Sequence, residues 1–79
     1  MRIGTYEIED TILTDVSVEV LCKPKMDANL DDYELEVVWE LDTDKWHFTA
    51  IYAHENINVE DTLSEDTKER FKAYMKLMV

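Results

Sequence analysis

The sequence predicts an α+β fold of two layers, in which one C-terminal helix packs across an antiparallel sheet of three to four strands arranged as a meander. Apolar and polar residues alternate through residues 33–53, with the period of a strand, and apolar residues recur at helical spacing after Thr62. We expect the 79 residues, 1–79, to form a single domain. The hydrophobic fraction of 46% indicates a folded chain despite a net charge of −11.

A hairpin made from residues 33–41 and 46–53 is the clearest element. Its two apolar rows are Tyr33, Leu35, Val37, Trp39 and Leu41 on the first strand, and Trp46, Phe48, Ala50 and Tyr52 on the second. The segment Asp42-Thr43-Asp44-Lys45 is typical of a type I turn, because Asp at its first position bonds nearby backbone amides. If Asp42 pairs with Lys45, Leu41 lies opposite Trp46 and both rows share one face.

The other face of this hairpin is acidic. In the same register Glu40 lies opposite His47, which predicts a cross-strand ion pair, and Glu36 lies opposite Ile51. Val38 also belongs to this face, and we expect Leu13 and Leu21 to extend its apolar part.

Two further strands are predicted before the hairpin. The first, within residues 1–13, has its apolar residues at 3, 6, 8 and 12, with a bulge or bend at Asp10-Thr11. The second, residues 16–22, alternates cleanly, and its apolar residues Val16, Val18, Val20 and Cys22 are predicted to face one way. A loop over residues 23–32 then returns the chain so that Val20 lies against Leu35.

The C-terminal segment predicts a helix from about Leu63 to the end of the chain. Thr62-Leu63-Ser64-Glu65 has the form of a capping box, with Ser64 as a competing N-cap. We expect Lys68, Lys72 and Lys76, one turn apart, to follow a solvent-facing line. The apolar residues that we expect to face the sheet are Leu63, Phe71, Tyr74, Met75 and Met78.

Negative charge is concentrated in the sheet-forming part of the chain. Residues 1–61 carry 16 acidic and four basic residues, whereas residues 62–79 carry three acidic and four basic residues. Residues 26–44 hold eight acids and no base. Such a surface repels nucleic acid and anionic membranes, so we expect neither as a direct partner, and it attracts a basic protein.

The single cysteine, Cys22, excludes an internal disulfide and favours a reducing cytoplasm, the host cytoplasm if the protein is encoded by a phage. The N-terminus lacks an apolar run, so we expect no signal peptide, and no segment is apolar enough to predict a membrane span. Because Cys22 lies on an apolar row, we expect it to be buried and unreactive.

The sequence predicts neither a metal site nor a cofactor. Asp27-x-Asn29-x-Asp31 matches the opening of a calcium-binding EF-hand loop, but Asp32 stands where that loop needs Gly and Val38 where it needs Glu. His47 and His54 have opposite strand parity and do not share a face. No Gly-framed nucleophile is present, so we expect a protein that is not an enzyme.

The expected contact surface is the acidic strand face together with the acids that flank it. Glu34 and Glu36 are ~6.6–7 Å apart on a strand, which is similar to the separation of successive phosphates on one nucleic-acid strand. The predicted partner-binding residues are Asp31, Asp32, Glu34, Glu36, Val38, Glu40, Asp42, Asp44 and Ile51. The alternative is a solvated strand face whose charge serves only solubility.

In size and charge the chain is similar to phage-encoded anti-defence proteins, including anti-CRISPR and anti-restriction inhibitors, a likeness of composition across the whole chain. It implies a small acidic protein, in some cases a DNA mimic, that binds and inhibits a basic, nucleic-acid-handling protein. Two alternatives stay open. One is an immunity or antitoxin protein that neutralises a basic toxin. The other is a non-catalytic assembly module, such as a homodimer, that associates through its sheet.

Overall fold

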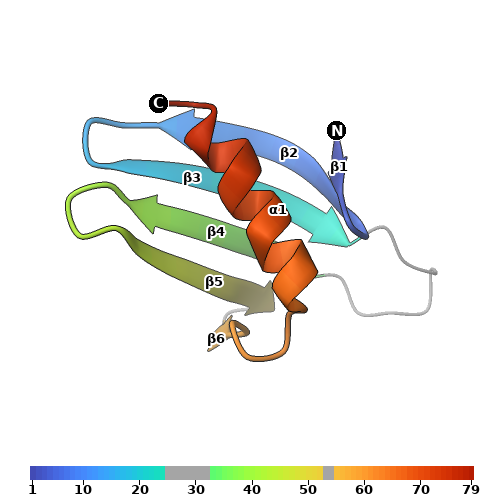
Figure 1. Ribbon diagram of the computed structural model, residues 1–79. Helices are drawn as coiled ribbons and strands as arrows, with labels where there is room; N and C mark the ends of the chain where they lie inside the picture. The colour runs from blue at the N-terminus through green and yellow to red at the C-terminus, as the bar shows by residue number, and fades with distance from the viewer. Residues whose placement is uncertain (25–32, 53–54) are drawn as a thin grey trace.

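The computed structural model describes residues 1–24, 33–52 and 55–79, which form one antiparallel sheet and one helix (Figure 1). The elements in chain order are β1 (Arg2–Ile3), β2 (Tyr6–Leu13), β3 (Ser17–Pro24), β4 (Glu34–Glu40), β5 (Lys45–Tyr52), β6 (Glu55–Asn58) and α1 (Glu65–Lys76). The strands lie in the sheet in the order in which they follow along the chain, so the predicted α+β meander with a C-terminal helix is confirmed.

The predicted count of three to four strands is wrong, because the sheet has six. The two additional strands are the edge strands β1, of two residues, and β6, of four. A two-residue turn joins β1 to β2, and Gly4 in this turn has a φ of 58°, a conformation that glycine adopts without strain. Segments this short leave no measurable alternation in the sequence.

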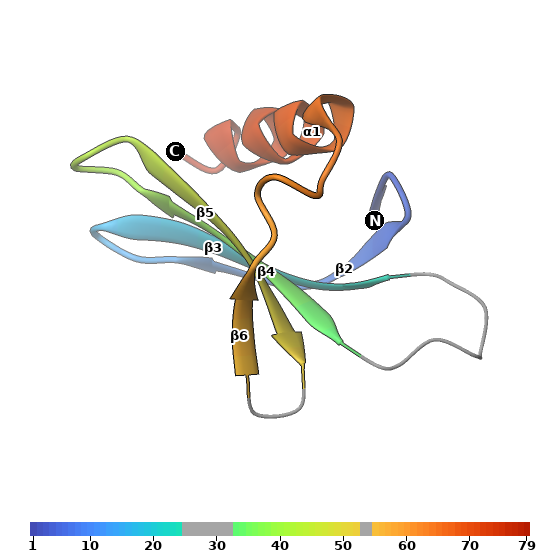
Figure 2. The ribbon, with the colours of Figure 1, turned by 90° about the horizontal axis from the view of Figure 1, so that it is seen from below.

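The helix α1 covers one face of the sheet (Figure 2). The apolar rows of the strands pack with the buried residues of the helix in one core cluster. Phe71 and Met75 are its buried residues, as predicted. The Phe71 ring centroid lies 6.1 Å from that of Tyr6 and 6.4 Å from that of Phe48. The buried cluster comprises Ile3, Tyr6, Val18, Val20, Cys22, Leu35, Val37, Phe48, Phe71 and Met75.

The predicted register of the central hairpin is wrong by two residues. Glu40 pairs with Lys45, so the connecting loop has four residues, and Trp39 lies opposite Trp46 rather than Phe48. The loop closes through Asp44, which has a φ of 55°, a conformation that Asp tolerates better than most residues. Strand parity has a period of two, so this slip leaves each side chain on its predicted face.

The two indole rings stack as a result of this register. Their centroids lie 4.9 Å apart with 5° between the ring planes. Trp39 Nε1 donates a hydrogen bond of 2.8 Å to Asp44 Oδ1, which ties the strand to the loop. A slip of two residues also applies between β3 and β4, where Cys22, rather than Val20, pairs with Leu35.

A β-bulge interrupts β2 at Glu9, one residue before the predicted position. Ile8 pairs with Cys22, and the next pair is Asp10 with Leu21. The additional residue reverses the parity of the rest of the strand, so Leu13 shares the face of Val18 and α1. The expectation that Leu13 lies on the face away from the helix is therefore wrong.

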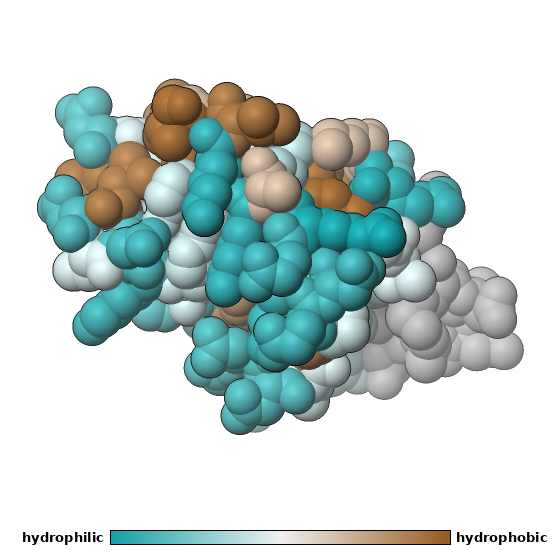
Figure 3. Space-filling view, viewed as in Figure 1, coloured by the Kyte–Doolittle hydropathy of each residue, from teal (hydrophilic) through white to brown (hydrophobic). Residues whose placement is uncertain are grey.

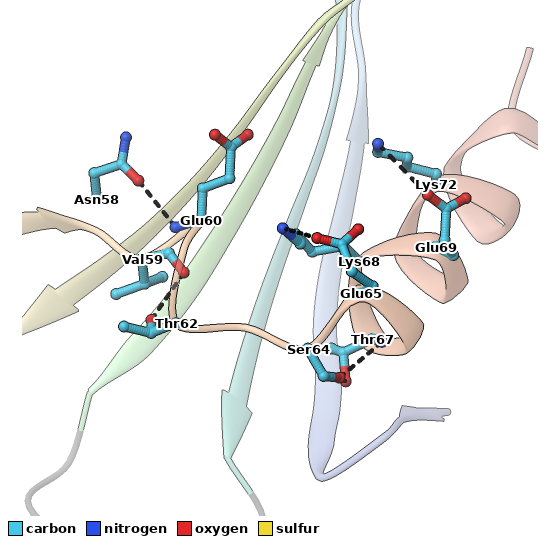
Figure 4. Close-up of polar contacts among 10 residues, drawn as sticks. All are labelled: Asn58, Val59, Glu60, Thr62, Ser64, Glu65, Thr67, Lys68, Glu69 and Lys72. Atoms are coloured by element: carbon cyan, nitrogen blue, oxygen red, sulfur yellow. Dashed lines mark hydrogen bonds and ion pairs between the residues drawn. The ribbon is translucent and has the colours of Figure 1, made fainter.

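Helix α1 begins at the competing N-cap. Ser64 Oγ accepts a hydrogen bond of 3.1 Å from the Thr67 amide, whereas Thr62 Oγ1 donates to the Val59 carbonyl in the preceding connection (Figure 4). In the described part of the chain no helix is long and apolar enough to cross a membrane.

Two of the three helix lysines lie partly buried beside the sheet, which corrects the expected solvent-facing line. Lys68 Nζ lies 2.8 Å from Glu65 Oε1, and its side chain is largely covered. Lys72 Nζ lies 5.7 Å from the centroid of the Trp46 ring, a cation–π geometry. The aliphatic parts of both side chains therefore help to cover the sheet beside α1.

Candidate functional site

The sheet face opposite α1, here called the open face, is the strongest candidate for a functional surface. None of the described helices or strands covers it (Figure 2). The register assigns five carboxylates to it from three neighbouring strands, and these are Asp10, Glu19, Glu34, Glu36 and Glu40. Four aliphatic side chains lie among them, and these are Ile12, Leu21, Val38 and Ile51.

Acidic and apolar side chains alternate across the open face as well as along its strands. One row across the sheet reads Ile12, Glu19, Val38 and His47. The next row reads Asp10, Leu21, Glu36, Thr49 and Asn58. In the pairs of the described strands, no carboxylate lies directly opposite another carboxylate. This arrangement limits repulsion between like charges within one concentrated acidic surface.

The carboxylates are consequently diagonal neighbours. Glu19 is diagonal to Asp10 on one side and to Glu36 and Glu40 on the other, and diagonal positions are separated by roughly 7–8 Å. Glu34 and Glu36 follow each other along β4 at roughly 6.6–7 Å. The positions that bear negative charge therefore follow one another at steps of about 7 Å both along and across the strands.

Neighbouring side chains hold two of these carboxylates. Ser17 Oγ donates a hydrogen bond of 3.0 Å to Glu19 Oε2, and the loop residue Thr14 contacts the same hydroxyl at 2.9 Å. Glu40 contacts the His47 ring, as the sequence predicted, and also lies opposite Lys45. The positive charge of Lys45 therefore offsets the charge at the Glu40 end, and the acidic centre is formed by the remaining carboxylates.

The structure brings together five of the predicted partner-binding residues on the open face, Glu34, Glu36, Val38, Glu40 and Ile51. Asp42 is exposed in the β4–β5 loop. The Asp44 carboxylate accepts the Trp39 indole hydrogen bond, so it is engaged within the loop. Asp31 and Asp32 lie outside the described residues.

Sequence reasoning missed Glu19 and Asp10, which complete the face. The alternation in residues 16–22 already placed Glu19 opposite the apolar row, and this was the signal for it. Asp10 gave no such signal, because the bulge at Glu9 decides which face it takes.

No group of three or more metal-ligating side chains occurs among the residues that the structure describes. The calcium-like segment of residues 27–32 and His54 fall in the parts of the chain that are not described. On the open face the carboxylates alternate with aliphatic side chains and do not converge on one point. This arrangement suits contact with an extended charged surface.

Cys22 is fully buried under α1, as predicted, and its Sγ donates to the Leu35 carbonyl at 3.4 Å. Burial, with a smaller contribution from the charge of Glu9, raises the pKa of this thiol to about 12.

We therefore expect Cys22 to react with a thiol reagent such as 5,5′-dithiobis(2-nitrobenzoate) only very slowly at pH 8, because the thiolate is the nucleophile. Chain unfolded in guanidinium chloride is the control and should react at the rate of a free cysteine. Equal rates in the folded and unfolded protein would contradict the burial of this side chain.

A cavity of about 390 Å³ lies on the helix side of the sheet, where Tyr6, Tyr33 and Tyr52 line it together with aliphatic residues. The hydroxyls of Tyr6 and Tyr33 are 3.1 Å apart, and burial raises the pKa of Tyr6 well above its usual value. Tyr6 lies on β2, Tyr52 ends β5 and Tyr33 immediately precedes β4, so no local pattern predicted the cavity. Its lining provides no group that is ionised at neutral pH.

No protein-family model matches the chain, and neither a curated protein nor a solved structure shows significant similarity to it.

Proposed function

We propose that this protein is a non-catalytic inhibitor that binds a basic, nucleic-acid-handling protein, with its open face in the groove that the partner uses for nucleic acid. The observation that carries the proposal is the set of five carboxylates on one uncovered sheet face, at steps of about 7 Å. A phage anti-defence protein that acts as a DNA mimic would need such a surface. The cytoplasm is the compartment that fits a partner of this kind.

The chemistry of the open face suits a cationic groove. Lysines and arginines that neutralise phosphates would meet carboxylates at similar steps, and the sheet fixes the backbone positions from which those carboxylates project before binding. The aliphatic residues Leu21 and Val38 lie between them and are half-buried. They offer apolar contact at the centre of the interface, where polar rims commonly surround apolar cores.

Binding to a basic toxin, as an antitoxin or immunity protein does, would use the same surface and the same forces. Self-assembly through the sheet is less favoured by the geometry. Two open faces packed together would bring ten carboxylates into one interface, and the net charge of −11 on each copy adds repulsion. The acidic surface therefore favours a partner of opposite charge.

The test is a charge-matched pair of variants. In the first, Glu34, Glu36 and Glu40 are all changed to Gln, which removes three charges from the open face. In the control, Glu55, Glu60 and Glu69, which are exposed and lie off that face, are changed to Gln. Both variants should fold normally, and their net charges are identical.

We expect the open-face variant to associate with the partner ~10-fold more slowly and with a flatter dependence on salt, because charge complementarity acts mainly on the association rate. The control should retain most of the wild-type rate. The partner would be identified first by affinity capture from host lysate, and rates measured by surface plasmon resonance at three salt concentrations. Short duplex DNA should compete with the wild-type protein. Equal rates and equal salt slopes for the two variants would refute the proposal.

A further inference from the structure

The outer edge of β2 is largely unpaired. β1 has only two residues and covers Tyr6 and Glu7, and the Met1 carbonyl accepts a hydrogen bond of 2.8 Å from the Ile8 amide. Beyond Ile8, no described strand pairs with this edge of β2. The sheet therefore ends on one side with a strand whose last five residues, 9–13, have a free edge.

The phase of the β2–β3 ladder shows which backbone groups are free. The Thr14 amide donates to the Ser17 carbonyl at 2.9 Å, so this pair is a hydrogen-bonded pair of the hairpin. Because bonded and non-bonded pairs alternate in an antiparallel ladder, Ile12 bonds to β3, whereas Thr11 and Leu13 direct their N–H and C=O groups outward. An incoming strand thus finds two donors and two acceptors at the spacing of a sheet.

Exposed apolar side chains surround this free edge. Ile12 is 45% exposed, Leu13 56%, Met1 67% and Leu77 80%. Figure 3 shows hydrophobic surface gathered at the upper left, over the region where α1 ends beside β2. Exposed patches of this kind commonly mark interaction sites.

A groove of about 430 Å³ lies between β1 and α1 beside the same edge, and its apolar lining includes Met1, Ile3, Ala73 and Leu77. Arg2 and Arg70 also line it, and they are paired with Glu7 and Asp66. Tyr74 also lines it, and its hydroxyl lies 3.0 Å from Thr11 Oγ1, which fixes the helix to the edge strand. A strand that continued the line of β1 along β2 would direct alternate side chains into this groove.

The negative charge near the free edge of β2 favours a bound strand that is positively charged. Glu9 and Asp10 immediately precede the free groups, and the whole chain has a net charge of −11. Acidic residues and a bulge on an edge strand discourage pairing with another copy of the same strand. They attract a strand that carries lysine or arginine on the side facing Asp10.

We propose that the free edge of β2 binds an extended segment of the basic partner as an additional strand, antiparallel to β2 and in line with β1. Apolar side chains of that segment occupy the groove beside Tyr74, and its cationic side chains face Asp10 on the open face. This inference rests on the proposed function and adds to it a second mode of contact, through the backbone. The edge and the open face then form one continuous interface.

The test uses a defined probe, a synthetic eight-residue peptide that alternates lysine with valine, and a matched peptide that alternates glutamate with valine. Binding is followed by NMR of ¹⁵N-labelled protein. We expect the cationic peptide to shift the Thr11 and Leu13 amides and to protect them from hydrogen exchange, and the acidic peptide to have no effect.

The decisive variant is Leu13→Pro, which removes an outward N–H and no bond to β3. It should weaken binding of the cationic peptide at least 10-fold. Asn56→Pro is the matched control at the opposite edge, because the Val59 amide bond to the Phe48 carbonyl (2.9 Å) sets the ladder so that Asn56 also points outward. This control should bind the peptide like the wild type.

Three results would overturn the inference. The first is an absence of shifts at millimolar cationic peptide. The second is shifts confined to β4 and β5, with Leu13→Pro binding normally, which would leave the proposed role of the open face intact. The third is a wild-type dimer that Leu13→Pro dissociates, which would assign the edge to a second copy. Failure of the open-face proposal is read separately, from the Glu34, Glu36 and Glu40 variant.

Discussion

Replacement of Phe71 by alanine is expected to destabilise the protein by ~3–5 kcal/mol, because the ring is fully buried and its removal leaves a cavity between two rigid layers. Phe71 contacts Tyr6 on β2 and Phe48 on β5, so it joins the helix to distant strands. A loss of this size is comparable to the whole stability of many small folds, about 5 kcal/mol at the low end. The variant should be largely unfolded at 37 °C.

Urea denaturation, followed by tryptophan fluorescence and by circular dichroism, measures this effect. The matched control is Leu77→Ala, just after α1, where the side chain is 80% exposed and the expected change is within about 0.5 kcal/mol. If Phe71→Ala unfolded at the same urea concentration as the wild type, the helix would not be the cover of the sheet.

The periodicity of the apolar residues predicted most of the fold. Alternation in β3, β4 and β5 identified the strands and the face of each side chain, and the helical spacing of Phe71 and Met75 identified the second layer. These signals are local and repeat over several residues, so single irregularities do not erase them. The Ser64 cap was also visible, since its side chain bonds an amide three residues away.

Register was not predictable in the same way. The slip of two residues between β4 and β5 preserves every face, so the hydrophobic pattern is equally satisfied by both registers. Which register forms depends on the four-residue loop, on the left-handed backbone conformation of Asp44 and on the stacking of Trp39 over Trp46. These features exist only in the folded hairpin.

The candidate site was predicted in part for the same reasons. Glu34, Glu36 and Glu40 follow from alternation within one strand, whereas the neighbouring Glu19 becomes relevant only once β3 is known to lie beside β4. The bulge at Glu9 moved Asp10 onto the open face and Leu13 onto the helix face. A bulge changes one residue of spacing, and no residue type in the sequence marks it uniquely.

Two adjacent residues of β4 should respond to the same substitution with very different losses of stability. Val37→Asp is expected to cost roughly 4–5 kcal/mol and to unfold the protein, because it places a carboxylate without a partner in the fully buried layer beneath α1. Val38→Asp should cost no more than about 1 kcal/mol. Its side chain is half-buried on the open face between Glu19 and His47, where water still reaches the added charge and reduces its repulsion from Glu19.

The comparison of Val37 with Val38 tests which face of β4 is turned toward α1. The residue type and the substitution are the same, and the two positions are adjacent. Thermal melts and urea midpoints at neutral pH measure both variants against the wild type. A folded Val37→Asp variant together with an unfolded Val38→Asp variant would reverse the two faces, and Glu34, Glu36 and Glu40 would then lie toward α1. The acidic surface requires that Val37→Asp, and not Val38→Asp, causes the large loss of stability. A folded Val38→Asp variant can then be used to test whether partner binding needs the apolar contact at that position.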